Sequence, residues 1–411
     1  MLDVARKIYG SSEAREQAGV FTSQILLNLS FFIVIVFASL RLDPGTFARL
    51  SLTNSWINVL ATLFAFGLDQ SALKLSFERR DSSYIAINIF AKAALFMTAF
   101  LSFLIGTALF GPNVNLMIVA AAAGVAFWSA TRVVEQYERR FTRLTWMNSV
   151  LAITRVGAGS IAVLFNSWIL IILAVHVVAQ LPIHFATLTT AMRNLWPMLK
   201  VSSVRPLLVV SPLMFTSAAL YSALPVITQS LLHYRGEDLA TSAFGVALIF
   251  MAPIDILIAT IRNYVLPQVL YRDLNEVNVF GLGNGSFNTV VTLFAVLFIA
   301  VTLPVAGIIH WIYGQRLAMA GPFFLIYFGG LIITASIGLY NIRAQRHNLL
   351  RIALMVNLGR VGATTLPFLF PAASPLAIVT WSAVVQVVGE VILWVALTWA
   401  ERNRALTLSP P

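Results

Sequence analysis

The sequence contains no cysteine, which excludes disulfide bonds, thiolate metal sites and cysteine nucleophiles. Charged side chains are also scarce: they make up 10% of the 411 residues, against roughly 25% in a soluble globular protein. Hydrophobic residues make up 59%, and the mean hydropathy is +0.86. So much apolar surface cannot all lie in one soluble core. Most of it must therefore face lipid.

Acidic residues are fewer than basic ones, 16 against 27, so the net charge is +11. A basic chain raises the question of nucleic acid. Here the Arg and Lys residues form short clusters between apolar runs, without interleaved aromatic residues, as the positive-inside pattern of membrane proteins requires. We therefore expect membrane lipid, and no nucleic acid, around this protein.

Apolar runs of about 20 residues are the main feature that is present, and each is long enough to span a bilayer. Asn166 and Ser167 alone separate two of them, which predicts a tight helical hairpin. The composition thus predicts an all-α polytopic membrane protein with about 12 transmembrane helices. The runs are 19–40, 47–68, 85–109, 116–134, 147–165, 168–190, 206–228, 241–262, 286–312, 321–341, 352–371 and 376–400.

Basic residues between the runs predict the orientation. Twenty of the 27 lie on one side, and only Arg41, Arg49, Arg235 and Arg316 lie on the other. The remaining three lie inside the runs. The basic side is cytoplasmic by the positive-inside rule, which places both termini in the cytoplasm. Residues 1–17 are too charged for the core of a signal peptide, and no small-residue cleavage site follows. They are predicted to form an interfacial leader before an uncleaved first span.

A weak internal repeat divides the chain. A polar turn at residues 41–48 opens the second run, and a similar turn at residues 234–240 opens the eighth, six runs later. Because six is even, both halves keep the same orientation, and a pseudo-two-fold axis along the membrane normal relates them. We expect an N-terminal six-helix lobe at 1–197 and a C-terminal six-helix lobe at 198–411, joined by residues 191–206.

Three stretches resemble a known family. They are 43–48 with the end of the same run at 66–73 (FGLDQSAL), 266–270 (LPQVL), and 312–320 with 356–358. The order and content of nearly the whole chain are similar to the multidrug/oligosaccharidyl-lipid/polysaccharide exporter superfamily, in its O-antigen and polysaccharide flippase branch. Twelve runs argue against the peptidoglycan-precursor flippases of that family, which typically have fourteen.

The resemblance implies a V-shaped, two-lobed transporter with a central cavity. It also implies a substrate, a lipopolysaccharide-type glycan unit linked to undecaprenyl pyrophosphate, which alternating access would flip across the bacterial inner membrane. Polymerase or glycosyltransferase partners go with that function, whereas the protein itself would be a monomer. No cofactor and no enzymatic activity are expected.

Ionisable side chains inside an apolar run cost about 2.5–3.5 kcal/mol each on insertion scales, so each needs an explanation. Seven lie away from the ends of their runs: Lys92, Arg155, His176, His184, Asp255, Arg360 and Glu390. At about 1.5 Å per residue, the five that are not histidines lie roughly 10–15 Å from the cytoplasmic ends of their runs. A common depth predicts the lining of a water-filled cavity that opens inward.

Within that cavity the roles follow from charge. Arg155, Arg360 and Lys92 are the candidates for binding the pyrophosphate or glycan, because cations pair with phosphate oxygens. Asp255 and Glu390 are the candidates for ion coupling. His176 and His184, eight residues apart on one helix, are a candidate proton relay.

Each candidate also has a structural alternative. The flexible stem of Lys92 can carry its charge to the interface. Small residues beside Arg155 and Arg360 suit close helix packing. Glu390 can pair with one of the cations and lock the lobes together, and Asp255 follows a proline that commonly marks a bent helix.

The two histidines can be hydrogen-bonded packing residues. Asp69 and Lys74, at the end of the second run, are expected to be solvated. No His/Asp/Glu set has the spacing of a metal site, and no catalytic triad can be assembled.

Two other functions remain open. An ion-coupled exporter of small molecules shares the two-lobed architecture and needs acids such as Asp255 and Glu390 in its cavity. A membrane-embedded glycan polymerase or glycosyltransferase usually needs a large extracytoplasmic loop, and every outward connection here is short.

Overall fold

The computed structural model describes residues 12–252, 286–341, 349–370 and 372–408. All regular structure in these residues is helical, with no strand among them. Ten helices of the described part are long and apolar enough to cross a membrane. They coincide with ten of the twelve predicted runs. The run 206–228 lies inside a longer helix, and the run 241–262 begins in the helix Asp238–Ala252 and continues outside the described residues.

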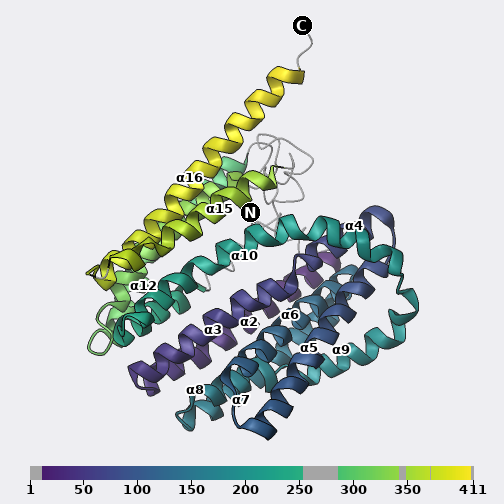
Figure 1. Cartoon of the computed structure of the whole chain (residues 1–411), viewed down its shortest axis with the longest axis horizontal. Coiled ribbons are helices and arrows are strands. Elements are labelled where there is room, and N and C mark those ends of the chain that lie inside the picture. Colours follow the sequence, from purple (N-terminus) through teal and green to yellow (C-terminus); the bar gives the residue numbers. More distant parts are fainter. Residues whose placement is uncertain (1–11, 253–285, 342–348, 371, 409–411) are drawn as a thin grey trace. The chain divides into compact units, whose positions relative to one another are not determined.

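The first half of the chain contains helices α2 to α9 (Figure 1). Their bounds are α2 Ser12–Arg41, α3 Pro44–Ala65, α4 Leu68–Arg79, α5 Ser83–Phe110, α6 Val114–Tyr137, α7 Phe141–Leu164, α8 Trp168–Leu173 and α9 Leu181–Asn194, with a π-helical turn, η1, at Ala174–Val178. Helix α2 is continuous from Ser12, so residues 12–17 of the expected leader belong to the first spanning helix. Residues 1–11 lie outside the described part.

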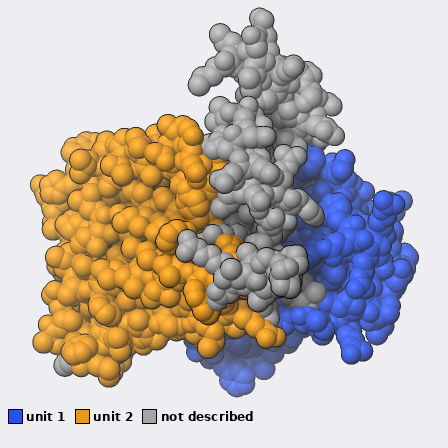
Figure 2. Space-filling model, turned by 90° about the horizontal axis from the view of Figure 1, so that it is seen from above, with its two compact units in different colours: residues 1–215 blue, residues 216–411 orange. Residues whose placement is uncertain are grey.

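The second half contains α10 Val204–Tyr234, the helix Asp238–Ala252, α12 Ser286–Tyr313, α13 Ala320–Asn341, α15 Leu350–Thr365 and α16 Pro375–Leu408, with a short 3₁₀ turn, η5, at Leu366–Leu369. The chain divides into two compact units, residues 1–215 and 216–411 (Figure 2). The division falls inside α10, whereas the sequence placed it after residue 197.

Short polar residues begin and end these helices. The Asp43 carboxylate accepts a hydrogen bond from the Thr46 backbone N–H at 3.0 Å, and Pro44 opens α3; this is a strong helix start. The predicted hairpin at 166–167 is confirmed: Asn166 has a positive φ of 53°, and Ser167 precedes α8. Two residues with left-handed backbone conformation, Phe66 and Gly67, separate α3 from α4. The predicted run 47–68 therefore ends at this break, and a further helix, α4, follows it.

Small residues allow the helices of unit 1 to approach closely. Helix α2 packs along α7, where a Cβ on Gly159 would lie 2.7 Å from the Val34 side chain. Helix α6 buries four consecutive alanines, residues 120–123, against its neighbours. Close backbone approach of this kind is how helices associate in a bilayer, because lipid removes the hydrophobic drive that acts in water.

In unit 2, helix α13 packs between α12 and α16. Three phenylalanines of α13, Phe323, Phe324 and Phe328, are completely buried. Large apolar side chains on the outer faces of both units remain exposed, such as Phe110 at 86% and Trp311 at 85%. Such surfaces suit a lipid environment.

The connection between the halves is tied to unit 1. The Lys200 ammonium lies 3.2 Å from the Asp81 carboxylate, and the Ser203 and Ser83 hydroxyls are 2.6 Å apart. Both contacts join residues of the linker to the turn between α4 and α5. The linker predicted at 191–206 is therefore docked on the first unit up to the start of α10.

Candidate functional site

The described part of the chain contains six of the seven intramembrane candidates. Unit 1 holds Lys92, Arg155 and the two histidines, and unit 2 holds Arg360 and Glu390. All six are buried. Asp255 lies outside the described residues, as does Pro253 beside it.

Lys92 of α5 pairs with Asp69 of α4. The Lys92 ammonium lies 2.6 Å from the Asp69 carboxylate, and the side chains are 1% and 16% exposed. Asn88 and Ser129 also donate hydrogen bonds to Asp69, at 2.8 and 2.6 Å. The prediction of a solvated Asp69 was wrong, because its carboxylate is paired with a buried lysine. Asp69 comes just after the break between α3 and α4, and its carboxylate contacts the lysine of the next helix, α5. Hydropathy does not reveal such a contact.

Arg155 of α7 has a different environment. One guanidinium nitrogen lies 3.5 Å from the Leu27 carbonyl oxygen, and the guanidinium carbon lies 5.8 Å from the centre of the Phe31 ring. Its Nε is buried without a hydrogen-bond partner. Among the described residues, no carboxylate forms an ion pair with Arg155. A buried cation without a counter-charge is costly, which distinguishes Arg155 from the paired Lys92.

His176 lies beside this arginine on the π-helical turn η1. Its Nε2 is 2.9 Å from the Asn54 side-chain oxygen, and its ring packs 5.7 Å from the ring of Phe31. Single π-helical turns are rare and frequently occur at functional sites. The turn brings a histidine to the same aromatic ring that Arg155 covers.

His184 has separate contacts. Its Nε2 lies 3.1 Å from the Gln180 side-chain oxygen, and its ring packs between Phe96 and Phe127 at 4.8 and 4.7 Å. Hydrogen-bonded packing, the alternative considered for both histidines, describes these contacts. The proton relay through His176 and His184 stays a prediction.

Arg360 of α15 and Glu390 of α16 form a buried ion pair in unit 2. The guanidinium lies 2.6 Å from the carboxylate, and the two side chains are 2% and 7% exposed. Asn341 donates to the second carboxylate oxygen at 2.6 Å, and Asn357 accepts from the arginine at 3.0 Å. The pair lies within one unit, so it does not join the two lobes.

Gly389 leaves room for the Arg360 side chain of that pair. A Cβ at this position would lie 2.0 Å from the Nε of Arg360. The arginine side chain therefore crosses the backbone of α16 at the residue before its partner, Glu390. This close approach is a requirement that the sequence pattern alone did not indicate.

The charged candidates of unit 1 lie in two separate groups of side chains. Arg155 and His176 share contacts with Phe31, and His176 also contacts Asn54 in the middle of α3. Lys92 pairs with Asp69 of α4, on the other side of the break at Phe66 and Gly67. The expected common depth of the charges stays a prediction.

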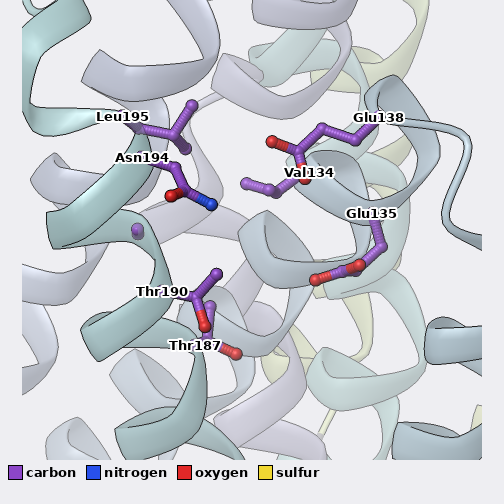
Figure 3. A pocket seen from close by; sticks show the side chains of 8 residues that line it. Val134, Glu135, Glu138, Thr187, Thr190, Asn194 and Leu195 are labelled. Atoms are coloured by element: carbon purple, nitrogen blue, oxygen red, sulfur yellow. The ribbon is translucent and has the colours of Figure 1, made fainter.

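A small pocket lies between the ends of α6 and α9 (Figure 3). Carboxylates of Glu135 and Glu138 line it from α6, and Thr187, Thr190 and Asn194 line it from α9. Arg143 approaches both helices, at 3.4 Å from Glu135 and 3.0 Å from the Thr190 hydroxyl. Arg140 pairs with Glu138 at 2.9 Å. Both acids lie beyond the end of the apolar run 116–134, so hydropathy gave no signal for them, and arginines already balance their charge.

Comparisons of the structure with solved proteins identify the fold. An inward-facing multidrug resistance MATE family transporter of the MOP superfamily matches with a TM-score of 0.62 and 12% identity, over 94% of this chain and 96% of that one. A MATE protein in the straight conformation matches with a TM-score of 0.60 and 13% identity, over 98% and 99%.

A third match is a MOP superfamily transporter from Pyrococcus furiosus Vc1, whose binding pocket is described as having reverse polarity. Its TM-score is 0.54 at 12% identity, over 98% of each chain. No protein-family model and no curated protein matches the sequence. The chain is therefore a multi-pass membrane protein with the fold of MATE transporters over almost its full length.

Proposed function

We propose that this chain is a membrane transporter of the MOP superfamily that exports small molecules by alternating access. The match of nearly the whole chain to an inward-facing multidrug transporter carries this proposal. This match favours the small-molecule exporter over the glycan flippase that the sequence resemblance implied. Because the neighbours are transporters, we propose no enzymatic activity.

The charges of the described spans favour an anionic solute over an organic cation. Binding a cation requires a carboxylate that is free to face it. Here Asp69 is neutralised by Lys92 and Glu390 by Arg360. Arg155, by contrast, has no ion pair with a described carboxylate. For the Pyrococcus protein, the reverse polarity of the binding pocket suggests a different function, and we apply the same criterion here.

The lipid-linked glycan flippase remains a second candidate because of one observation. The guanidinium of Arg155 is a planar fork that matches phosphate oxygens, and a pyrophosphate linker presents several of them. Under this proposal Arg155 contacts the linker. Lys92 and Arg360 would be less suited, since each already has a carboxylate partner.

Coupling to an ion gradient is proposed through Asp255. Of the two predicted acids, Glu390 is bound to Arg360 and Asn341. Asp255 therefore becomes the stronger candidate. Replacing Asp255 with Asn should make export independent of an imposed proton or sodium gradient, whereas unchanged gradient dependence would contradict this role.

The experiment is transport by the purified protein in proteoliposomes, with three probes compared in parallel. They are an anionic fluorescent dye, a cationic dye and a polyprenyl-pyrophosphate oligosaccharide. We expect export of the anionic dye, a strong reduction in Arg155→Gln, and wild-type rates in the control His233→Gln, which replaces a partly exposed histidine outside the candidate residues. Movement of the oligosaccharide alone would establish the flippase, and movement of the cationic dye alone would contradict the charge argument.

The predicted membrane orientation is part of the proposal. Reporter fusions after Arg143 and Lys200 should report the cytoplasm, and fusions after Asn113 and Glu237 the opposite side of the inner membrane. An inverted report at any of these positions would contradict the twelve-span topology.

A further inference from the structure

The two buried arginines occupy equivalent places in the internal repeat. Arg155 lies on the fifth predicted run and Arg360 on the eleventh, each eight residues after its run begins, at 147 and 352. Each guanidinium also lies over an aromatic ring from the first helix of its half, Phe31 of α2 and Tyr221 of α10. Both distances are 5.8 Å. Two independent observations, the position in the run and the contact with an aromatic ring, thus relate the two arginines.

The two arginines differ in the side chain that the sixth helix of each half brings to them. In unit 2 it is α16, and its Glu390 carboxylate binds Arg360 at 2.6 Å. In unit 1 the sixth predicted run begins with α8 and η1, which bring His176 to Phe31 instead. Arg155 retains a single 3.5 Å contact with a backbone carbonyl. In the described part of unit 1, the anion that completes the arrangement of unit 2 is therefore missing.

His176, which packs on the same Phe31 ring as Arg155, has one ring nitrogen without a hydrogen-bond partner. With Asn54 accepting from Nε2, the other ring nitrogen, Nδ1, carries a lone pair and is buried without a hydrogen-bond partner. A proton placed there would meet no acceptor. It would also create a second positive charge near Arg155, whose field acts on this histidine. A bound anion would remove both obstacles.

Among the described residues, no charged side chain other than Arg155 contacts His176 from the elements packed around it. Helices α2 and α3 contribute Phe31 and Asn54, which do not titrate. Helix α6 contributes Gly124, whose Cβ position is 3.4 Å from the His176 carbonyl oxygen. The charged residues of α6, from Arg132 onward, begin about 12 Å further along that helix.

We propose that unit 1 binds an oxyanion between Arg155 and His176, in the role that the Glu390 carboxylate plays beside Arg360. The anion and a proton on Nδ1 of His176 stabilise each other, so binding takes up a proton. The ligand is an oxyanion group, a carboxylate, sulfate or phosphate. Its source is either a free inorganic ion or the charged group of an exported solute; only the second source rests on the proposed function.

Sulfate is the suitable probe because its charge does not change between pH 5.5 and 7.5. Binding is measured by calorimetry on the full-length protein in nanodiscs, in buffers free of other oxyanions and of chloride. We expect sulfate to bind at least tenfold more tightly at pH 5.5 than at pH 7.5. Repeating the titration in buffers of different ionisation heat should show proton uptake.

Four variants test the roles of the residues. Arg155→Gln should abolish binding at both pH values, and Arg155→Lys, which keeps the charge without the fork, should weaken it. His176→Gln should retain weak binding that no longer depends on pH. His184→Gln is the matched control and should bind sulfate as the wild type does.

Two further variants exchange the surroundings of the two arginines and test for a gain of stability or of binding, not only for a loss. His176→Glu supplies an internal carboxylate, as in unit 2, and should eliminate sulfate binding while raising the unfolding temperature. Glu390→Gln vacates the carboxylate beside Arg360 and should create a second sulfate site. A folded Arg155→Gln variant that still binds sulfate would show an adventitious ion only.

Two further outcomes would overturn the proposal: a folded wild-type protein that does not bind sulfate, and binding that is independent of pH. Export of dye in proteoliposomes separates this result from the proposed function. Export without sulfate binding would refute the site alone, and sulfate binding without export would refute the transporter function alone. Competition of sulfate with dye export identifies the solute as the source, and its absence identifies a free ion.

Discussion

Arg155 in unit 1 and Arg360 in unit 2 are both buried, and each lies 5.8 Å from the centre of an aromatic ring on the first helix of its half. They differ in what neutralises them. Arg360 has the Glu390 carboxylate at 2.6 Å, held in turn by Asn341. Arg155 has a distant carbonyl oxygen and a neighbouring histidine. The same arrangement is thus closed by the protein in one half and left for a ligand in the other.

Removing the counter-charge of Arg360 should lower the free energy of unfolding more than any other proposed substitution. Glu390→Gln leaves Arg360 buried and unpaired, and we expect a loss of about 3–5 kcal/mol of stability. Arg155→Gln removes a cation that has no described carboxylate partner, so it should cost less than about 1 kcal/mol or stabilise the protein. Both are measured by thermal unfolding in detergent micelles at one pH. Equal losses in the two variants would remove the distinction between the units.

The Lys92–Asp69 pair should behave asymmetrically. Asp69→Asn leaves a lysine that is 1% exposed without a counter-charge, whereas Lys92→Met leaves an aspartate that is 16% exposed and hydrogen-bonded to Asn88 and Ser129. We expect a loss of about 2–3 kcal/mol for the first change and about 1 kcal/mol for the second. The same unfolding assay checks this, and a larger loss for Lys92→Met would show that Asp69 is the less solvated partner.

The glycine under Arg360 provides a steric test of the closed arrangement. Gly389→Ala places a Cβ against the arginine side chain, and overpacking of this kind costs about 1–3 kcal/mol. Gly362→Ala is the matched control, because nothing lies within 4 Å of its Cβ position. It should be neutral or slightly stabilising, since alanine favours helix. Similar losses in both would mean that Arg360 moves aside without cost.

The smallest effect is expected at the exposed pair between the linker and unit 1. A hydrogen bond from the Ser83 backbone N–H, and then Lys200, hold the pKa of the Asp81 carboxyl below its ordinary value of 3.8. A lowered folded-state pKa contributes stability above about pH 4, and this is lost as the pH falls through the lowered value. Asp81→Asn should therefore cost below 1 kcal/mol at pH 7 and nothing near pH 2. Unfolding at the two pH values checks this, and an equal cost at both would point to packing instead of charge.

The sequence predicted the spanning helices well because length and hydropathy are local properties. Ten described helices fall on predicted runs, and the hairpin at Asn166 and Ser167 was identified from its two-residue polar gap. The sites were less predictable. Asp69 was interpreted as solvated because its position in the run suggests an interface, yet the neighbouring helix brings Lys92 to it.

The sequence by itself determined that this chain is an α-helical membrane protein and which ionisable residues lie in its spans, because a charge within an apolar run is visible without a partner. Only the tertiary structure decided which charges are neutralised. In lipid nearly all faces of a helix are apolar, so periodicity does not reveal which faces meet. The packing of α15 on α16 brings Arg360 to Glu390, and the packing of α7 against α2 and η1 brings Arg155 to Phe31 and His176. Contacts between residues distant in the chain therefore determine that Arg360 has a built-in counter-charge, whereas Arg155 has none in the part of the chain that the structure describes.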